Sequence, residues 1–180
     1  MMKALGEAND ICDLYIQSGQ ETLGSLWETP IDNKKDFQMY KAELLDISNN
    51  HKSSFSCDEN IILRLYFNVQ KRIPGVYGYL QFTRSDGTIA WVSDSNDFGN
   101  NKLERLPLGK SIVDIQIPKR SLGVGKYSVY LNFTSRQSLG IDGWNVDSPK
   151  DVCSFSIYDD RTMRGDSRDG YLSTLIDWKF

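Results

Sequence analysis

Alternation between apolar and polar side chains governs this chain from residue 37 onward and constrains its fold more than any other feature. In the run 61–70, apolar residues occupy every odd position, and most even positions are polar or tyrosine. A β-strand directs successive side chains to opposite faces, so this period of two predicts a strand buried on one face. Similar runs, rich in β-branched and aromatic residues, predict strands at 37–48, 61–70, 76–84, 88–93, 111–118, 126–134, 152–158 and near 171–178.

Turn-forming residues separate the predicted strands. They include Pro74-Gly75, Gly99-Asn100 and Asp86-Gly87, and the last pair is the strongest hairpin signal in the chain. Short strands without intervening helices favour two packed sheets, and 180 residues suffice for one such domain. The predicted fold is therefore all-β, an Ig-like antiparallel β-sandwich with a short N-terminal helix.

The residues before the strands have a different pattern. Apolar residues recur at helical spacing in 3–18, and Gly19 follows where a C-terminal cap is expected. Residues 20–36 are polar and rich in turn formers, and we interpret them as a linker. The predicted organisation is a helical segment at 1–19, a linker at 20–36 and the sandwich at 37–180.

The alternation also assigns side chains to faces. The face opposite the core row carries a set of tyrosines and amides in the strands 76–84 and 126–134: Tyr77, Tyr79, Gln81, Tyr130 and Asn132. These side chains share one exposed surface if the two strands are neighbours, as strands C and F of Ig-like sandwiches are. Tyr127 follows a glycine by two residues at a strand start, which is typical of a tyrosine corner whose hydroxyl bonds to upstream backbone.

Tyrosines and amides arranged in this way indicate carbohydrate binding. A tyrosine ring offers an apolar body for the C–H face of a sugar and a polar tip for its hydroxyls. Trp91, Trp144 and Arg136 lie near strand ends and loops, where function commonly resides, and are candidates for the same site. The alternative is structural, because aromatic residues also favour strands for packing, and Arg136 is as readily explained as a solvated charge.

Composition argues against several other functions. Lys and Arg number 21 and Asp and Glu 24, a net charge of −3 that does not favour nucleic acid. His51 is the only histidine and lies in a polar turn, no P-loop motif occurs, and no His, Cys, Asp or Glu cluster has metal-ligand spacing. We therefore expect a non-catalytic domain without a metal or cofactor.

The cysteines indicate a cellular compartment. Cys12, Cys57 and Cys153 are odd in number and widely spaced, which is typical of free thiols in a reducing environment. The first residues have no apolar core of a leader, and no apolar run approaches the roughly 20 residues of a membrane span. The expected location is the cytoplasm.

Several segments, taken in order, resemble one known family. They are Phe55-Ser-Cys-Asp-Glu-Asn60 before 61–67, Gly78-Tyr-Leu-Gln-Phe82, Asp86-Gly87-Thr88, Ile115-Gln-Ile-Pro118, Leu122-Gly-Val-Gly-Lys-Tyr127, Phe155-Ser-Ile157 and a tail with Arg164-Gly165, Gly170-Tyr171-Leu172 and Asp177-Trp178. Together they look like the C-terminal carbohydrate-binding domain of Wzt-type ATP-binding subunits of O-antigen polysaccharide ABC transporters. The resemblance covers residues 37–178.

This resemblance implies a function and partners. Such a domain binds O-antigen polysaccharide, often at its non-reducing end, and so selects this part of the lipopolysaccharide for export. It implies a homodimer whose last strand can be exchanged between subunits, and it places 1–19 at the end of a preceding ATPase domain. The polar stretch 160–170 is of the kind that acts as a hinge for such an exchange. In the whole transporter a membrane permease is a further partner, and the location is the cytoplasmic face of the inner membrane. No ligand residue is carried over, because these vary with the glycan.

Two competing functions remain open at the level of sequence. A structural or protein-binding Ig-like module would use the same fold without a sugar site. A hydrolase on a sandwich fold would need two carboxylates facing each other across a cleft, which a sequence alone does not exclude.

Overall fold

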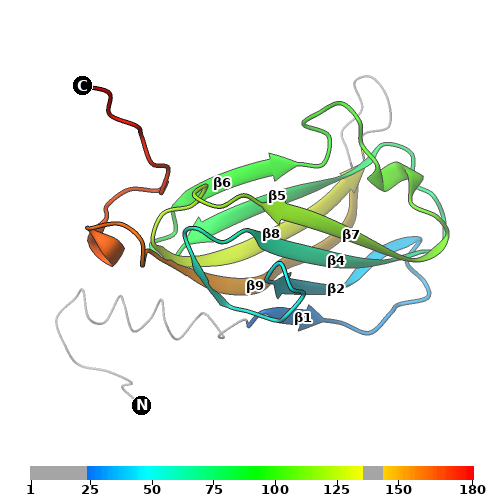
Figure 1. The fold of residues 1–180 in the computed structure, drawn as a ribbon. Coiled ribbons are helices and arrows are strands. Elements are labelled where there is room, and N and C mark those ends of the chain that lie inside the picture. The colour runs from blue at the N-terminus through cyan, green and yellow to red at the C-terminus, as the bar shows by residue number, and fades with distance from the viewer. Residues whose placement is uncertain (1–23, 136–143) are drawn as a thin grey trace, which may run out of the picture.

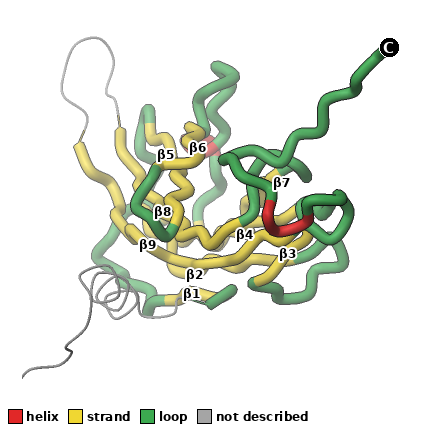
Figure 2. Tube along the Cα trace, turned by 90° about the vertical axis from the view of Figure 1, so that its left-hand side faces the viewer, coloured by secondary structure: helices red, strands yellow, loops and turns green. Residues whose placement is uncertain are grey.

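Two β-sheets stack face to face to form a sandwich, drawn in two views in Figure 1 and Figure 2. The structure, a computed structural model, describes residues 24–135 and 144–180. One sheet has four strands in the order β1 (Leu26–Glu28), β2 (Phe37–Leu45), β4 (Ile61–Val69) and β7 (Gly109–Ile117). The other has five strands in the order β3 (Ser54–Ser56), β9 (Trp144–Tyr158), β8 (Gly125–Ser135), β5 (Val76–Arg84) and β6 (Ile89–Asp94). Two short 3₁₀ helices, η1 (Leu103–Arg105) and η2 (Gly165–Ser167), lie outside the sheets.

The pairing of the strands confirms the predicted Ig-like antiparallel sandwich. Every neighbouring pair in both sheets is antiparallel except β3 with β9, which run parallel. The predicted N-terminal helix at 3–18 falls outside the described residues. Within the described ranges, no helix has the length and apolar character needed to cross a membrane.

Element boundaries differ from the sequence prediction at several places, and the strand predicted at 152–158 begins already at Trp144, as β9. The range 20–36, expected as a linker, contains β1, whose three residues pair with residues 41–43 of β2. β3 was not predicted, because a three-residue strand is too short for its period to be recognised. The segment 171–178 was predicted as a strand. It forms no strand in the single chain, although its apolar composition is typical of one.

Apolar side chains from both sheets fill the space between them. In β4 the buried and half-buried residues alternate along the whole strand, as the period of two requires. The rings of Phe37, Phe67 and Phe133 meet there, with centroids 5.2 to 5.8 Å apart. Cys153 is fully buried in the same core, and this burial raises the pKa of its thiol to about 12. Cys57 and Cys153, the two cysteines in the described ranges, are both free.

A buried carboxylate joins the two sheets along one side. β2 carries a bulge between Met39 and Lys41, and the Met39 amide beside it bonds to a side chain of the other sheet. Asp147 of β9 accepts a hydrogen bond from the Met39 amide at 2.8 Å and forms an ion pair with Lys35 at 2.7 Å. This contact ties β9 of the five-stranded sheet to β2 of the other. Breaking it would leave a buried amide without a partner, which is costly.

The C-terminal segment begins docked against one end of the sandwich and then leaves it. Tyr171 accepts a hydrogen bond from the Gly123 amide at 2.7 Å, and Thr174 donates to the Arg120 carbonyl at 3.1 Å. Beyond Thr174 the chain extends away from the sheets (Figure 1, Figure 2). Its last apolar side chains are exposed by half or more of their surface: Leu175, Ile176, Trp178 and Phe180.

The tyrosine corner predicted at Tyr127 is confirmed and yields a stability prediction. The ring is 2% exposed, and its hydroxyl donates to the Gly123 carbonyl at 2.8 Å. Tyr127→Phe leaves that carbonyl without its donor, and we expect a loss of about 1–2 kcal/mol in the free energy of unfolding, measured by urea denaturation. Tyr40→Phe, at a half-buried ring of β2, is the control. Equal midpoints for the two variants would show that the buried hydrogen bond adds nothing.

Candidate functional site

The tyrosines and amides predicted to share a face do share one. β5 and β8 are paired side by side at the middle of the five-stranded sheet, with Tyr79 opposite Asn132 and Gln81 opposite Tyr130. Tyr77 stands one row further along the same face, opposite Thr134. All these side chains are half-buried, whereas the residues between them point into the core. We call this surface the tyrosine face and define it as Tyr77, Tyr79, Gln81, Tyr130 and Asn132.

Contacts within the tyrosine face hold its side chains in place before any ligand arrives. The rings of Tyr79 and Tyr130 meet edge to face, with centroids 6.2 Å apart. The Tyr79 hydroxyl donates to the Gln81 side-chain carbonyl at 2.9 Å, and the Gln81 amide donates to the Thr83 hydroxyl at 2.8 Å. Since ordering rotamer-rich side chains opposes binding, such contacts reduce the entropy that a ligand must offset.

Bulges in β9 bring further polar groups to this face. The pairing of β9 with β8 shifts register three times between Val129 and Thr134, beside the tyrosine face. There the Ser148 hydroxyl lies within hydrogen-bond distance of the side-chain oxygens of Asn132, at 2.5 Å, and of Asn145, at 2.8 Å, and its one proton is donated to one of them at a time. Both amides are thereby positioned beside the face. Bulges commonly redirect side chains beside functional sites, and the bulges of β9 do so next to the central strands.

Carboxylates stand on the strands that flank the tyrosine face. Asp151 of β9 is opposite Tyr130, and Asp94 of β6 is opposite Tyr79. Sugar hydroxyls are donors as well as acceptors, and a carboxylate is an acceptor only. The flanking strands therefore add the acceptors that complement the amide donors at the centre.

A groove of about 370 Å³ adjoins the tyrosine face at Tyr77. It lies between the connection that precedes β5 and the connection from β6 to β7, and Tyr77, Asp94, Asn96, Asp97, Glu104 and Arg105 contribute to its lining. The volume falls in the range of about 300–1,000 Å³ that is usual for small-ligand sites. In Figure 1 this connection lies at the opposite end of the sandwich from the C-terminal segment.

The loop that borders the groove is fastened to β5. Gly78 and Ser95 exchange hydrogen bonds, since the Gly78 amide donates to the Ser95 hydroxyl and the Ser95 amide to the Gly78 carbonyl, both at 2.9 Å. Asn101 donates from its side chain to the Val76 carbonyl, and its own side-chain carbonyl accepts from the Leu103 amide at 3.2 Å. The groove is thus lined by a loop held to the same strand that carries Tyr77 and Tyr79.

Of the other predicted site residues, Trp91 and Trp144 fall within the described ranges. Trp91 is opposite Phe82, on the core side of the sheet, and its ring packs against Phe82 with centroids 5.5 Å apart. Trp144 begins β9 opposite Ser135 and is 43% exposed. Arg136 lies outside the described residues. Trp91 was predicted from its position near a strand end, which does not indicate the face of the sheet on which a side chain lies.

Sequence reasoning missed the polar groups on the flanking strands and in the groove. Pro149 was a usable signal for the β9 bulges, because proline inside a strand is confined to edges and bulges. The polar run 93–101 was a signal for a loop beside β5, but no local pattern reveals that its carboxylates close a groove against Tyr77.

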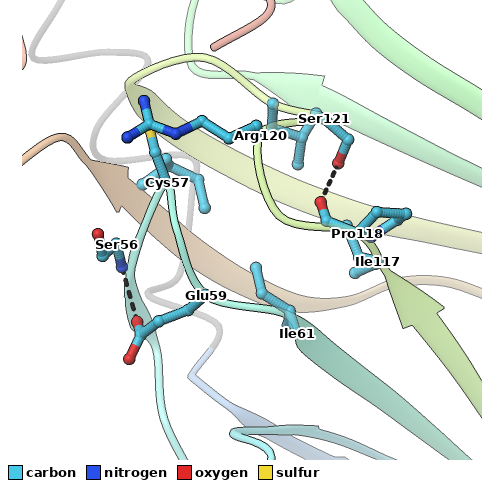
Figure 3. Close-up of a pocket in the computed structure, with 10 residues that line it drawn as sticks. Ser56, Cys57, Glu59, Ile61, Ile117, Pro118, Arg120 and Ser121 are labelled. Carbon is cyan, nitrogen blue, oxygen red and sulfur yellow. Dashed lines mark hydrogen bonds between the residues drawn. The ribbon is translucent and has the colours of Figure 1, made fainter. Parts of the chain in front are cut away.

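A second hollow beneath Arg120 is too small for a sugar. It lies between the connection that follows β3 and the one that follows β7, and its volume of about 10 Å³ is that of one water molecule (Figure 3). Two local hydrogen bonds fix its rim: Glu59 accepts from the Ser56 amide at 2.7 Å, and the Ser121 hydroxyl donates to the Pro118 carbonyl at 2.6 Å. In residues 24–135 and 144–180, no group of three or more His, Cys, Asp or Glu side chains is placed to hold a metal ion.

Comparisons with known proteins identify the fold. No protein-family model matches the chain, and no curated protein matches it in sequence. Among solved structures it is similar to a crystal structure of the C-terminal domain of wzt, with a TM-score of 0.64 and 11% sequence identity over 86% of this chain and 87% of that chain. The predicted resemblance to the Wzt C-terminal domain is thus confirmed at the level of the fold.

A glycine beneath the tyrosine face provides a test of how the site is supported. A Cβ atom on Gly78 would lie 2.9 Å from a ring atom of Phe133 and 3.2 Å from the Leu103 side chain. Gly78→Ala must therefore displace the core under Tyr77 and Tyr79, and we expect a loss of about 1–3 kcal/mol in the free energy of unfolding.

The control is Gly24→Ala, since a Cβ atom on Gly24 meets nothing within 4 Å. Chemical denaturation of both variants measures the difference. A Gly78→Ala domain as stable as the Gly24→Ala domain would mean that the core under the tyrosine face tolerates an added methyl group.

Proposed function

We propose that this chain binds an O-antigen-type polysaccharide without catalysing a reaction on it. The observation that carries the proposal is the tyrosine face, in which rings and amides from β5 and β8 stand half-exposed on two neighbouring strands. The groove at Tyr77 continues this surface and extends the contact beyond the flat sheet.

The chemistry of the face suits a sugar better than a protein surface. Tyr79 and Tyr130 offer apolar ring surface for the C–H groups of a sugar, and the amides beside them offer donors and acceptors for hydroxyls. The core of a protein interface is usually apolar and depleted of charge. Here Asp94 and Asp151 flank the rings, which disfavours the alternative of a structural or protein-binding Ig-like module.

The separation of the two carboxylates that flank the tyrosine face argues against their acting together as a hydrolytic pair. Glycosidases place two carboxyl groups about 5–9.5 Å apart across the scissile bond. Asp94 and Asp151 stand on β6 and β9, with β5 and β8 between them. Three strand spacings amount to about 14 Å, too far for that pair to act on one bond.

The transporter context comes from the resemblance of the sequence and fold to the C-terminal domain of wzt. In this setting the domain selects a finished polysaccharide, through its non-reducing end, for export by an ABC transporter. Its partners are an ATPase domain in the same subunit and a membrane permease, and it works in the cytoplasm at the inner face of the inner membrane.

A homodimer formed through the C-terminal segment belongs to the same proposal. Leu175, Ile176, Trp178 and Phe180 are exposed by half or more of their surface, and Trp178 stacks on Phe180 with centroids 6.4 Å apart. An apolar segment of this length needs a sheet edge to cover it, and exchange of terminal segments is a low-cost route to a dimer.

The binding test compares matched tyrosine variants. We expect the domain to bind the O-polysaccharide of its source organism, and Tyr77→Ala and Tyr130→Ala each to weaken binding by ~1–3 kcal/mol, about 5- to 150-fold in Kd, through lost ring stacking. Isothermal titration calorimetry on the purified domain measures these constants.

Tyr40→Ala is the matched control for the binding test. Tyr40 pairs with Tyr66 on the four-stranded sheet at 6.1 Å between centroids, nearly the spacing of Tyr79 and Tyr130. Its removal takes away an equivalent ring far from the tyrosine face. No heat from wild-type protein with that polysaccharide, or equal losses for all three variants, would contradict the proposed function.

Removal of residues 175–180 tests the dimer. The deletion keeps the docked residues up to Thr174, so the fold is retained while the exposed apolar residues are lost. We expect full-length protein to run as a dimer and the shortened protein as a monomer in size-exclusion chromatography with light scattering. A shortened protein that still forms a stable dimer would refute exchange of the C-terminal segment.

A further inference from the structure

Phe98 is the most exposed large apolar side chain among the described residues from β1 to β9. It is 99% exposed, whereas Ile47, the next in this part of the chain, is 72% exposed. A single exposed apolar residue is common on a protein surface and by itself indicates no function. Two further features distinguish Phe98: the loop that carries it is held in a fixed shape, and this loop lines the groove at Tyr77.

The connection that follows β6 folds into two successive turns, which keep Phe98 at the surface. The Asp97 amide donates to the Asp94 carbonyl at 3.0 Å, and the Gly99 amide donates to the Asn96 carbonyl at 2.8 Å. Phe98 is therefore the third residue of a turn that ends at Gly99, whose φ of 67° favours glycine. Because hydrogen bonds fix the backbone on both sides of Phe98, the fold itself presents this ring to solvent.

The groove lies directly beside Phe98. Asp97 and Gly99, its two neighbours in the chain, both line the groove. Tyr77 of β5 lines it as well, and the loop after β6 is hydrogen-bonded to that strand. The Phe98 ring therefore stands at the rim of the groove, close to any ligand seated in it and on the loop side, whereas Tyr77 belongs to the sheet.

The surroundings of Phe98 suit a sugar better than a protein surface. The loop residues around it are polar: Ser95, Asn96, Asp97, Asn100 and Asn101. The core of a protein interface is apolar and depleted of charge, whereas a sugar needs ring surface among groups that bond its hydroxyls. Phenylalanine has no polar tip, so it offers ring surface alone, which suits the C–H face of a sugar.

We propose that Phe98 is a ligand-binding residue whose ring stacks on the C–H face of a sugar seated in the groove, with Tyr77 in contact with the same sugar from β5. This inference rests on the proposed function and adds to it a binding residue outside the tyrosine face. It also specifies the ligand of the groove as a sugar with an open apolar face. The ring is fully hydrated in the free domain, so covering it with the sugar removes apolar area from water. The loop is already ordered, so little backbone entropy opposes this gain.

Substitutions at Phe98 test the inference by isothermal titration calorimetry with the purified O-polysaccharide of the source organism. Phe98→Ala should raise Kd about fivefold or more, through the loss of one stacked ring. Phe98→Trp keeps a flat ring and should bind within about twofold of wild type. Phe98→Leu keeps apolar area without a flat ring and should bind as weakly as Phe98→Ala.

The control is Ile47→Ala, which removes an exposed apolar side chain from the turn after β2 and should leave Kd unchanged. Since the Phe98 ring is fully exposed, its variants should unfold in urea at the midpoint of wild type. A change in Kd is then not a consequence of misfolding.

Two further measurements assign the ring to the groove. Tyr77→Ala combined with Phe98→Ala should weaken binding by less than the product of the two single losses, because both rings hold one sugar. In Phe98→Trp the added indole should shift its emission to shorter wavelength when polysaccharide is added, compared with wild-type protein treated in the same way.

The outcomes separate this inference from the function beneath it. Wild-type affinity in Phe98→Ala, with Tyr77→Ala and Tyr130→Ala still weakened, would overturn the inference and leave the function standing. So would losses that simply multiply in the combined variant, or Phe98→Trp emission that the polysaccharide leaves unchanged. A Phe98→Ala domain with altered elution but unchanged Kd would assign the ring to a contact between copies of the chain and contradict the inference. Absence of binding by the wild-type domain would instead refute the proposed function.

Discussion

Nine consecutive residue pairs join β5 to β8, and the candidate site depends on the register of that pairing. A slip of one residue in either strand would move its whole polar row from solvent into the core. The core prevents such a slip. Leu80 and Phe82 of β5 and Val129, Leu131 and Phe133 of β8 are nearly fully buried, so a shifted register would expose all of them at once. With about 1.5–3 kcal/mol for each large apolar side chain buried, the core fixes the register and thereby places Tyr79 beside Asn132.

Departures from a regular sheet then shape the surface around this pairing. β9 gains extra residues opposite Asn132, which turns Ser148 and Asn145 toward the face. Gly78 leaves room under the tyrosines for Phe133 and for Leu103 of η1, so the loop that lines the groove can lie close to β5. A regular ladder would have given a flat surface with the same tyrosines and no groove. The site is therefore made by the regular pairing of β5 with β8 at its centre, and by the bulged strand β9 and the loop between β6 and β7 beside it.

The sequence was sufficient for the regular part and insufficient for the rest. Alternation depends on local burial alone, so it predicted β4, β5 and β8 and the polar rows of Tyr77 to Gln81 and of Tyr130 and Asn132. The glycine two residues before Tyr127 predicted the tyrosine corner. Trp91 was a candidate because of its position near a strand end, and in the structure its ring packs against Phe82 on the core side of the sheet. The groove depends on contacts between residues far apart in sequence, such as Asn101 with Val76, and such contacts leave no periodic signal. Fold class is thus readable from one strand at a time, whereas the shape of a site is not.

Gly123 serves both the core and the C-terminal segment. Its carbonyl accepts from Tyr127, and its amide donates to Tyr171 at the end of the sandwich opposite the groove. A Cβ atom there would lie 2.3 Å from the Gly170 carbonyl, so only glycine allows the segment to dock. If the residues beyond Thr174 join two subunits, the groove of each subunit lies at the end of the sandwich opposite the segment that joins them. A repetitive polysaccharide that reaches both faces would then bind the second at the high effective concentration set by the first. Weak sugar stacking at each face could in this way become selective binding by the pair, without any change in the shape of either sandwich.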